Sequence, residues 1–222
     1  MATSTCRAHH HQIDTPRLIL RSAVPDDAPA IAHLRIDPAN SPFMPVEPDL
    51  SIEVYQNRIV DWTAAAERGE SAFMVIILRD ASDLPVVTST MENRDDGAGT
   101  LIGFGGFNSL NFARTPDGSA KEFRIGDTGI MIDHLHWRKG YALEALCATV
   151  EYGLYVLRCE HMLIETRRDN EPWRGLMRSM GLGDVEKERK GNRLHGEWVY
   201  KFGRDIWEEA KAGMVARGKW ML

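Results

Sequence analysis

The sequence predicts one domain of the α/β or α+β class with mixed strand pairing. Two observations indicate this class. Runs with strand or helix periodicity follow one another in the order β-α-α-β-β-β-α-β-α-β. The chain has 222 residues, 43% of them hydrophobic and 27% charged, which is enough for one well-filled core.

The chain opens with a strand and two helices. Residues 17–21 are typical of a first strand, and an acidic pair begins a helix over about 26–34. Four prolines then mark an irregular segment. Ser51 is suited to cap a second helix, whose apolar residues recur at helical spacing until Gly69 ends it.

Three strands are expected in the middle of the chain. Residues 73–78 form a continuous apolar run, and residues 101–107 and 123–132 are the next two strands. The glycines of 101–107 favour a bulged strand over a dinucleotide-binding loop, because no helix pattern follows. Residues 80–99 are expected to form an extended hairpin loop, and residues 111–120 a turn.

Helices and strands alternate in the last third. Apolar residues at offsets 0, 3, 4, 7, 11 and 14 from Leu143 form one face of a helix. Asn170, with a proline two positions later, predicts another helix, which Gly181 ends. The remaining elements are expected at residues 162–166 (strand), 198–202 (strand) and 206–215 (amphipathic helix).

Composition argues against several functional classes. The net charge of −5 gives no electrostatic footprint for nucleic acid. No apolar stretch suits a signal peptide or a membrane span, so a cytoplasmic protein is expected. The three cysteines match no metal-site spacing, and the histidines at 9–11 are interpreted as part of a frayed tail. No metal is therefore expected.

Residues 137–145 join the end of a strand to the start of a helix. Free N–H groups and the positive end of the helix dipole converge on an anion at such a junction. Gly140 lets a phosphate approach the backbone where a Cβ would obstruct it, and Arg138 and Lys139 add positive charge. This stretch predicts an anion-binding turn.

Four segments resemble the GCN5-related N-acetyltransferases (GNAT), especially their RimJ/RimL-like branch. They are residues 15–21, 127–132, 137–145 and 170–182. The resemblance implies a mixed, mostly antiparallel twisted sheet flanked by helices, with acetyl-CoA as cosubstrate. The expected organisation is a disordered tail (1–14), the acetyltransferase domain (15–203) and a C-terminal helical extension (204–222).

The resemblance also implies roles for single residues. Met131 and Ile132 on the central strand would hold the pantetheine and the acetyl carbonyl. Asn170 would bind the pantetheine arm or nearby backbone, cap its helix, or do both. The turn that would hold the pyrophosphate comprises Trp137, Arg138, Lys139, Gly140, Tyr141 and Ala142.

In this family a substrate amine attacks the thioester directly, so binding and orientation supply much of the rate. Asp127 is the first candidate for the general base, acting through water; the alternative is an ion pair with Arg124 or a turn cap. The further candidates are Glu165, then the histidines at 134 and 136, and Tyr200 as the acid for the leaving thiolate or as a core aromatic.

Two positions depart from the close relatives. Trp173 stands in place of a serine thought to assist the thiolate, and Asn192 in place of an acidic residue. Without a strong base, α-amino groups are favoured, since roughly a quarter are neutral near pH 7.4 against about one lysine in a thousand. The expected acceptor is a protein N-terminus or a small-molecule amine, with no nucleic acid or membrane partner and a homodimer possible. The alternative is an acyl-CoA-binding protein with little catalysis.

Overall fold

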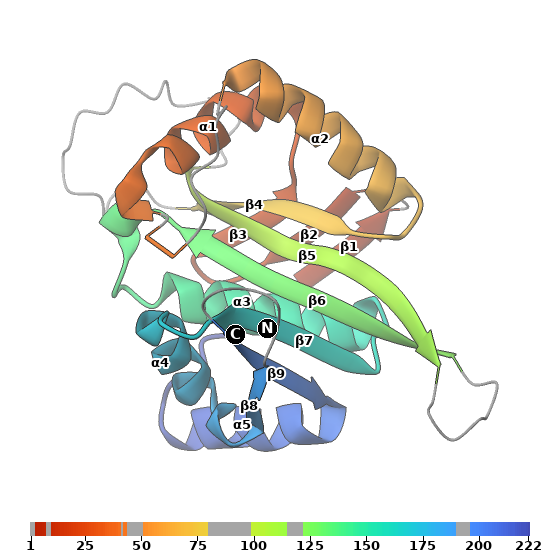
Figure 1. The fold of residues 1–222 in the computed structure, drawn as a ribbon, viewed down its shortest axis with the longest axis vertical. Helices are drawn as coiled ribbons and strands as arrows, with labels where there is room; N and C mark the ends of the chain where they lie inside the picture. The colour runs from red at the N-terminus through yellow and green to blue at the C-terminus, as the bar shows by residue number, and fades with distance from the viewer. Residues whose placement is uncertain are drawn as a thin grey trace.

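A computed structural model describes residues 3–7 (backbone only), 10–40, 42–43, 51–79, 99–114, 122–189 and 196–222. The described strands form one nine-stranded sheet in the order β1-β2-β3-β4-β5-β6-β7-β9-β8. Neighbours are antiparallel except for β6 and β7, which run parallel (Figure 1). The strands are β1 (Thr3–Arg7), β2 (His10–Asp14), β3 (Leu18–Ser22), β4 (Ala72–Leu78), β5 (Thr100–Arg114), β6 (Glu122–Ile132), β7 (His161–Arg167), β8 (Glu186–Arg189) and β9 (Glu197–Gly203). The mixed, mostly antiparallel sheet confirms the predicted fold class.

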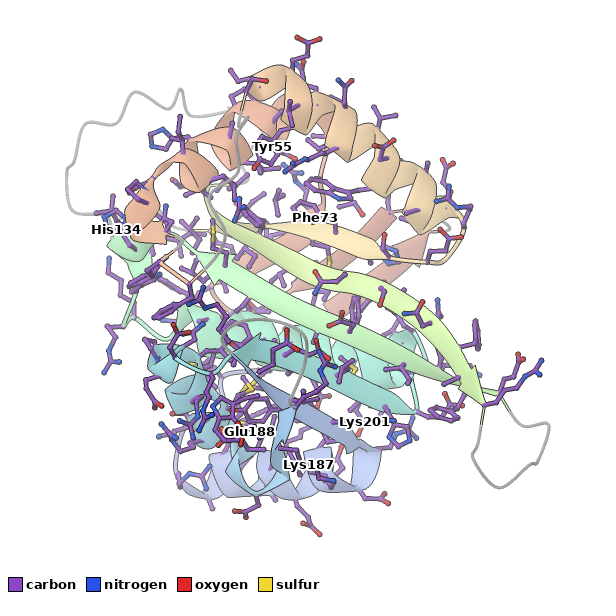
Figure 2. All side chains as sticks on the ribbon, in the orientation of Figure 1. Tyr55, Phe73, His134, Lys187, Glu188 and Lys201 are labelled. Carbon is purple, nitrogen blue, oxygen red and sulfur yellow. The ribbon has the colours of Figure 1, made fainter. Side chains whose placement is uncertain are left out.

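Two layers of helices enclose the sheet. One face packs on α1 and α2, through a buried cluster that includes Tyr55 and is extended by Phe73 (Figure 2). The other face packs on α3, α4 and α5, through a larger cluster that includes the fully buried Tyr200 and Trp207. The helices are α1 (Ala28–Ile36), α2 (Ile52–Glu67), α3 (Tyr141–Glu151), α4 (Glu171–Met180) and α5 (Arg204–Ala216).

Local signals in the sequence set several boundaries. The Ser51 hydroxyl accepts a hydrogen bond from the Val54 amide at 3.3 Å, as expected of an N-cap. Gly181 ends α4 with a φ of 82°, a left-handed conformation that glycine adopts at little cost. The predicted bulge is present, because the pairing of β5 with β6 shifts register between Phe107 and Ser109.

Three expectations differ from the structure. Strand β5 continues to Arg114 in register with β6, so residues 111–114 are not a turn; residues 115–120 lie outside the described part. Strand β8 was not expected, because the charged run EKER lacks the apolar alternation of a half-buried strand. Helix α3 passes into a π-helical segment, Tyr152–Val156, before the chain turns. Of the expected loop at 80–99, residues 80–98 lie outside the described part.

The expected disordered tail over residues 1–14 is wrong for the described residues, 3–7 and 10–14, which form the paired strands β1 and β2. Strand β2 pairs with β3 from Gln12 to Asp14, and Ile13 is buried in the main core. His11 is buried as well, with its Nδ1 atom 2.8 Å from the Tyr152 hydroxyl. The buried Ile13 and His11 alternate with exposed residues, as expected for a strand of the sheet. A buried polar side chain needs a partner, and His11 has one. Over the described residues, no helix combines the length and apolar character that a membrane crossing requires.

Candidate active site

The two parallel strands separate at their carboxyl ends. Pairing between β6 and β7 covers residues 125–127 and 161–163 and ends at Asp127 and Leu163. Beyond this point β6 stays paired with β5 as far as Ile132, whereas β7 stays paired with β9 (Figure 1). Ligands of α/β sheets commonly bind at carboxyl ends of strands, where neighbours part. Met131 and Ile132, the predicted pantetheine-binding residues, lie on this stretch of β6.

The turn after β6 has the geometry of an anion site. Gly140 has a φ of 84° and is followed at once by the first residue of α3, Tyr141. Arg138 also has a positive φ, of 65°, an uncommon conformation for a residue with a side chain. The first amides of α3 have no carbonyl partner within the helix, so they are available to an anion at this end. Trp137, Arg138 and Lys139 are exposed around the turn, whereas Tyr141 is buried and Ala142 half-buried.

Buried and half-buried contacts hold this turn in place. Glu144, in the first turn of α3, is fully buried and accepts hydrogen bonds from the Thr15 hydroxyl at 2.7 Å and the Arg17 Nε at 2.6 Å. Arg17 also donates to the Lys139 carbonyl at 3.0 Å. The Trp137 indole donates to the Ile132 carbonyl at 2.6 Å. The residues just before β3 and the end of β6 are thereby joined to the turn.

The residues present fit the pyrophosphate and arm of an acyl-CoA. A Cβ added at Gly140 would come within 3.3 Å of an Arg17 guanidinium nitrogen, so a side chain would disturb the turn. The Trp173 indole N–H is buried without a hydrogen-bond partner among the described residues. A buried donor without an acceptor costs about 1–3 kcal/mol, and an amide carbonyl of a bound pantetheine arm would supply that acceptor.

Asn170 caps α4, as one of its two predicted roles requires. Its Oδ1 accepts from the Trp173 amide at 3.2 Å, and its Nδ2 donates to the Thr166 hydroxyl at 3.1 Å. The side chain therefore ties the start of α4 to the end of β7. Its predicted contact with the pantetheine arm stays a prediction.

Asp127 lies where β6 and β7 begin to separate. It is half-buried, and the bulge in β5 turns Asn108 toward it to donate a hydrogen bond. Burial and the negative charge of Glu165 raise the pKa of Asp127, while Asn108 and Arg189 act in the opposite direction. A carboxylate whose pKa is raised toward the working pH is a better general base.

Glu165 shares this face of the sheet. Asp127 is in register with Leu163, and Leu163 and Glu165 are two apart on β7, so both carboxylates point to the same side. Both Glu165 oxygens accept from the Arg189 guanidinium, at 2.6 Å each. The guanidinium occupies both Glu165 oxygens, so Asp127 is the better placed of the two candidates to receive a proton.

Tyr200 lies on the opposite face. It is in register with Ile164, next to Glu165 on β7, and its buried ring packs in the cluster under α3, α4 and α5. Its hydroxyl donates to Glu186, and burial together with this carboxylate raises the pKa of Tyr200. The structure does not bring Tyr200 together with Asp127, and this disfavours its predicted role as the acid.

The two histidines before the turn are also engaged. His134 lies at the end of β6 beside the segment that follows α1 (Figure 2), and its amide donates to Asn40 at 2.6 Å. The buried His136 ring has its Nδ1 atom 3.4 Å from a carboxylate oxygen of Asp133. Both histidines follow the end of β6, so neither lies on the strand that carries Asp127.

The comparisons with known proteins agree with this geometry. The family model described as an acetyltransferase (GNAT) domain matches residues 17–183. The chain belongs to this family. As a GNAT protein it is an acyltransferase by class, and the fold implies that it binds an acyl-CoA. Comparison with curated proteins gives no match.

Solved structures of the same fold include a Mycobacterium smegmatis RimJ in complex with CoA-disulfide, with a TM-score of 0.67 and 14% identity over 98% of this chain and 94% of that one. The ribosomal-protein-S5-alanine acetyltransferase from Vibrio fischeri has a TM-score of 0.65 and 15% identity, over 88% and 98%. FdhC, described as a nucleotide-linked sugar GNAT, has a TM-score of 0.65 and 16% identity, over 94% and 97%. At these identities the likeness shows the fold.

Sequence reasoning did not identify Asn108 or Arg189. The bulge on β5 was expected, but which side chain it would turn was not. Arg189 lies on β8, a strand without an apolar pattern, next to residues 190–195 outside the described part. The pairing of Arg17 with Glu144 spans 127 positions, and no local signal indicates it.

Proposed function

We propose that the protein is an N-acetyltransferase that moves the acetyl group of acetyl-CoA to a primary amine by direct attack on the thioester. The observation that carries the proposal is the position of Asp127. This half-buried carboxylate, whose pKa is raised, lies at the point where β6 and β7 separate. The turn at Gly140 follows the carboxyl end of the same strand, after one short 3-10 turn.

In this proposal the chain mainly binds and orients. The amides at the start of α3, with Arg138 and Lys139, hold the pyrophosphate, and the backbone at Met131 and Ile132 aligns the pantetheine arm. Acetyl-CoA supplies an activated carbonyl carbon. Alignment of two reactants in one site replaces much of the entropy cost of their encounter.

Asp127 then receives the proton. The amine nitrogen forms a bond to the carbonyl carbon, the carbon–sulfur bond breaks, and coenzyme A leaves as its thiolate. The proton lost by the nitrogen passes through water to the Asp127 carboxylate and from there to solvent. Asn108, held by the bulge, keeps the carboxylate oriented through its hydrogen bond.

The proposed acceptor is an α-amino group of a protein N-terminus or a small-molecule amine. A single carboxylate is a modest base, so acceptors that are already partly neutral near pH 7 are favoured. Structures of the same fold include one described as a ribosomal L7/L12 alpha-N-protein acetyltransferase, with a TM-score of 0.60 and 16% identity over 86% of this chain and 97% of that one. FdhC, described as a nucleotide-linked sugar GNAT, supports keeping small-molecule acceptors in the proposal.

The alternative function is acyl-CoA binding with little catalysis, which the replacement of a family serine by Trp173 favours. Isothermal titration with acetyl-CoA, together with a thiol-release assay over peptides with free N-termini, lysine analogues and polyamines, separates the two. We expect binding, and release with at least one α-amine. Binding without release on any amine would favour the alternative, and no binding would refute both.

A further inference from the structure

Three charged side chains form a chain of ion pairs beside Asp127, on the same face of the sheet. Arg189, at the end of β8, donates to both oxygens of Glu165 and, through its Nε at 3.0 Å, to Glu197 on β9. The register places all three on one side, because Arg189 is opposite Glu197 and Glu197 is opposite Arg167, two residues after Glu165. We call this group the Arg189 cluster.

The guanidinium both fixes and neutralises Glu165. Two parallel N–H···O bonds from one planar fork hold a carboxylate in one orientation, which a single lysine ammonium does not do. The side chain of Lys201, which is opposite Leu163 on β9, is directed to the Phe123 ring, with its ammonium 5.5 Å from the ring centroid. The two hydrogen bonds that Glu165 accepts from a cation at this point come from Arg189.

Asp127 is sensitive to this compensation. Glu165 acts on it as a like charge and Arg189 as an opposite charge, and Asn108 contributes a neutral hydrogen bond. Two neighbouring carboxylates without a cation share a proton, since both do not ionise together readily. If Glu165 lost its partner, Asp127 would hold a proton over more of the neutral range and accept fewer from an amine.

We propose that Arg189 is a positioning residue of the acyl-transfer site: it binds both oxygens of Glu165 and thereby keeps Asp127 ionised to receive the proton of the acceptor. The inference rests on the proposed function, in which Asp127 is the base. Arg189 touches no reacting atom in this scheme. It acts through Glu165, and this route makes specific predictions for double variants.

The first test measures Asp127 itself in the protein without cofactor. The ¹³C shift of its carboxyl carbon is followed by NMR from pH 3 to 9 in the parent, Arg189→Met, Arg189→Lys and Glu165→Gln. We expect the titration midpoint to rise by about one pH unit in Arg189→Met, to rise less in Arg189→Lys, and to fall in Glu165→Gln. An unchanged midpoint in Arg189→Met overturns the inference.

A double variant tests whether Arg189 acts through Glu165. In Glu165→Gln the methionine substitution at 189 should move the midpoint by less than half of its effect in the parent, because the carboxylate it compensates is gone. A full effect in both backgrounds would contradict this route. The matched control is Arg168→Met, which removes another arginine that bonds β8, through Glu188 at 2.8 Å, and should leave the midpoint unchanged.

The second test uses turnover. The acidic limb of the pH profile of kcat/KM should move in the same direction and by the same amount as the NMR midpoint in each variant. A moved midpoint with an unmoved profile means that Arg189 does not serve transfer, and the inference fails. Absence of turnover in the parent with every amine refutes the proposed function instead, and the NMR series still measures the Arg189 cluster. Circular dichroism confirms that each variant is folded.

Discussion

The Nε atom of Arg17 lies 2.6 Å from the carboxylate of Glu144; Arg17 directly precedes β3, and Glu144 lies in the first turn of α3. Glu144 is fully buried, whereas about a third of the Arg17 side chain is exposed. The same guanidinium donates to the Lys139 carbonyl in the turn before α3. One ion pair thus anchors the helix whose N-terminus is the candidate pyrophosphate site, and it places a negative charge near the positive end of that helix.

Because Glu144 is fully buried and Arg17 is partly exposed, replacing each residue should lower the free energy of unfolding by a different amount. Arg17→Met leaves a carboxylate charge buried without its cation, which should lower the free energy of unfolding by about 3–5 kcal/mol. Glu144→Gln keeps the shape and leaves a partly hydrated guanidinium, so about 1.5–3 kcal/mol is expected. Urea unfolding at pH 7 measures both. The reverse order would contradict the idea that burial of Glu144 sets the strength of the anchor.

Gly140→Ala should weaken cofactor binding more than folding. A residue with a Cβ at a φ of 84° is strained by about 1–2 kcal/mol, and the added carbon would meet the Arg17 guanidinium. We expect at least a tenfold rise in the Kd for coenzyme A, measured by titration calorimetry. Gly175→Ala is the control: it lies within α4 with no atom within 4 Å of the added Cβ, so it should raise stability by up to about 1 kcal/mol and leave the Kd unchanged.

The sequence predicted the elements whose signals are local. Gly140, Asn170 and Gly181 mark helix ends through conformational needs that only a few residue types meet, and the apolar face from Leu143 defined α3. The position of the Gly140 turn at the start of α3 was therefore predicted, and its role in pyrophosphate binding stays a prediction. The features that the sequence did not predict depend on partners that are far away along the chain. His11 has no apolar signal, and its buried ring has a partner in the Tyr152 hydroxyl, 141 positions away.

The same distinction applies to the candidate base. The position of Asp127 two residues before Gly129 suggested its role, but the groups that set its basicity come from β5, β7 and β8. Arg189 lies on an edge strand, and only its pairing with the one neighbouring strand makes this segment a strand. Periodicity cannot indicate such a strand when its side chains are all charged.

Asp127→Asn should lower the rate of acetylation at least tenfold with little change in the affinity for acetyl-CoA. The amide cannot accept the proton, whereas the cofactor contacts of the Gly140 turn and of β6 are unaltered. Stopped-flow thiol release gives kcat, and calorimetry gives the Kd. Unchanged turnover would remove Asp127 from the mechanism. In the parent, activity should fall as the pH drops through a value above 3.8, the ordinary pKa of the group, because burial and Glu165 raise the pKa of Asp127.

The same substitution should leave the protein equally or more stable at pH 7. For a carboxyl whose folded pKa is raised, the charged form disfavours the fold, so stability is lost as the pH rises from 3.8 through the folded pKa. Asp127→Asn removes this loss, and its advantage should vanish near pH 3.

Asp133 provides the opposite case: burial acts against ionisation, but hydrogen bonds from His136 and the Leu135 amide lower the pKa of Asp133 overall. Its contribution is present above 3.8 and lost as the pH falls through the folded value, so Asp133→Asn should be less stable at pH 7 and converge with the parent in acid. Thermal unfolding from pH 3 to 8 measures both variants. A catalytic carboxylate is expected to destabilise the fold when ionised, whereas a structural aspartate stabilises it. If the two variants respond to pH in the same way, the assignment of Asp127 to catalysis is contradicted.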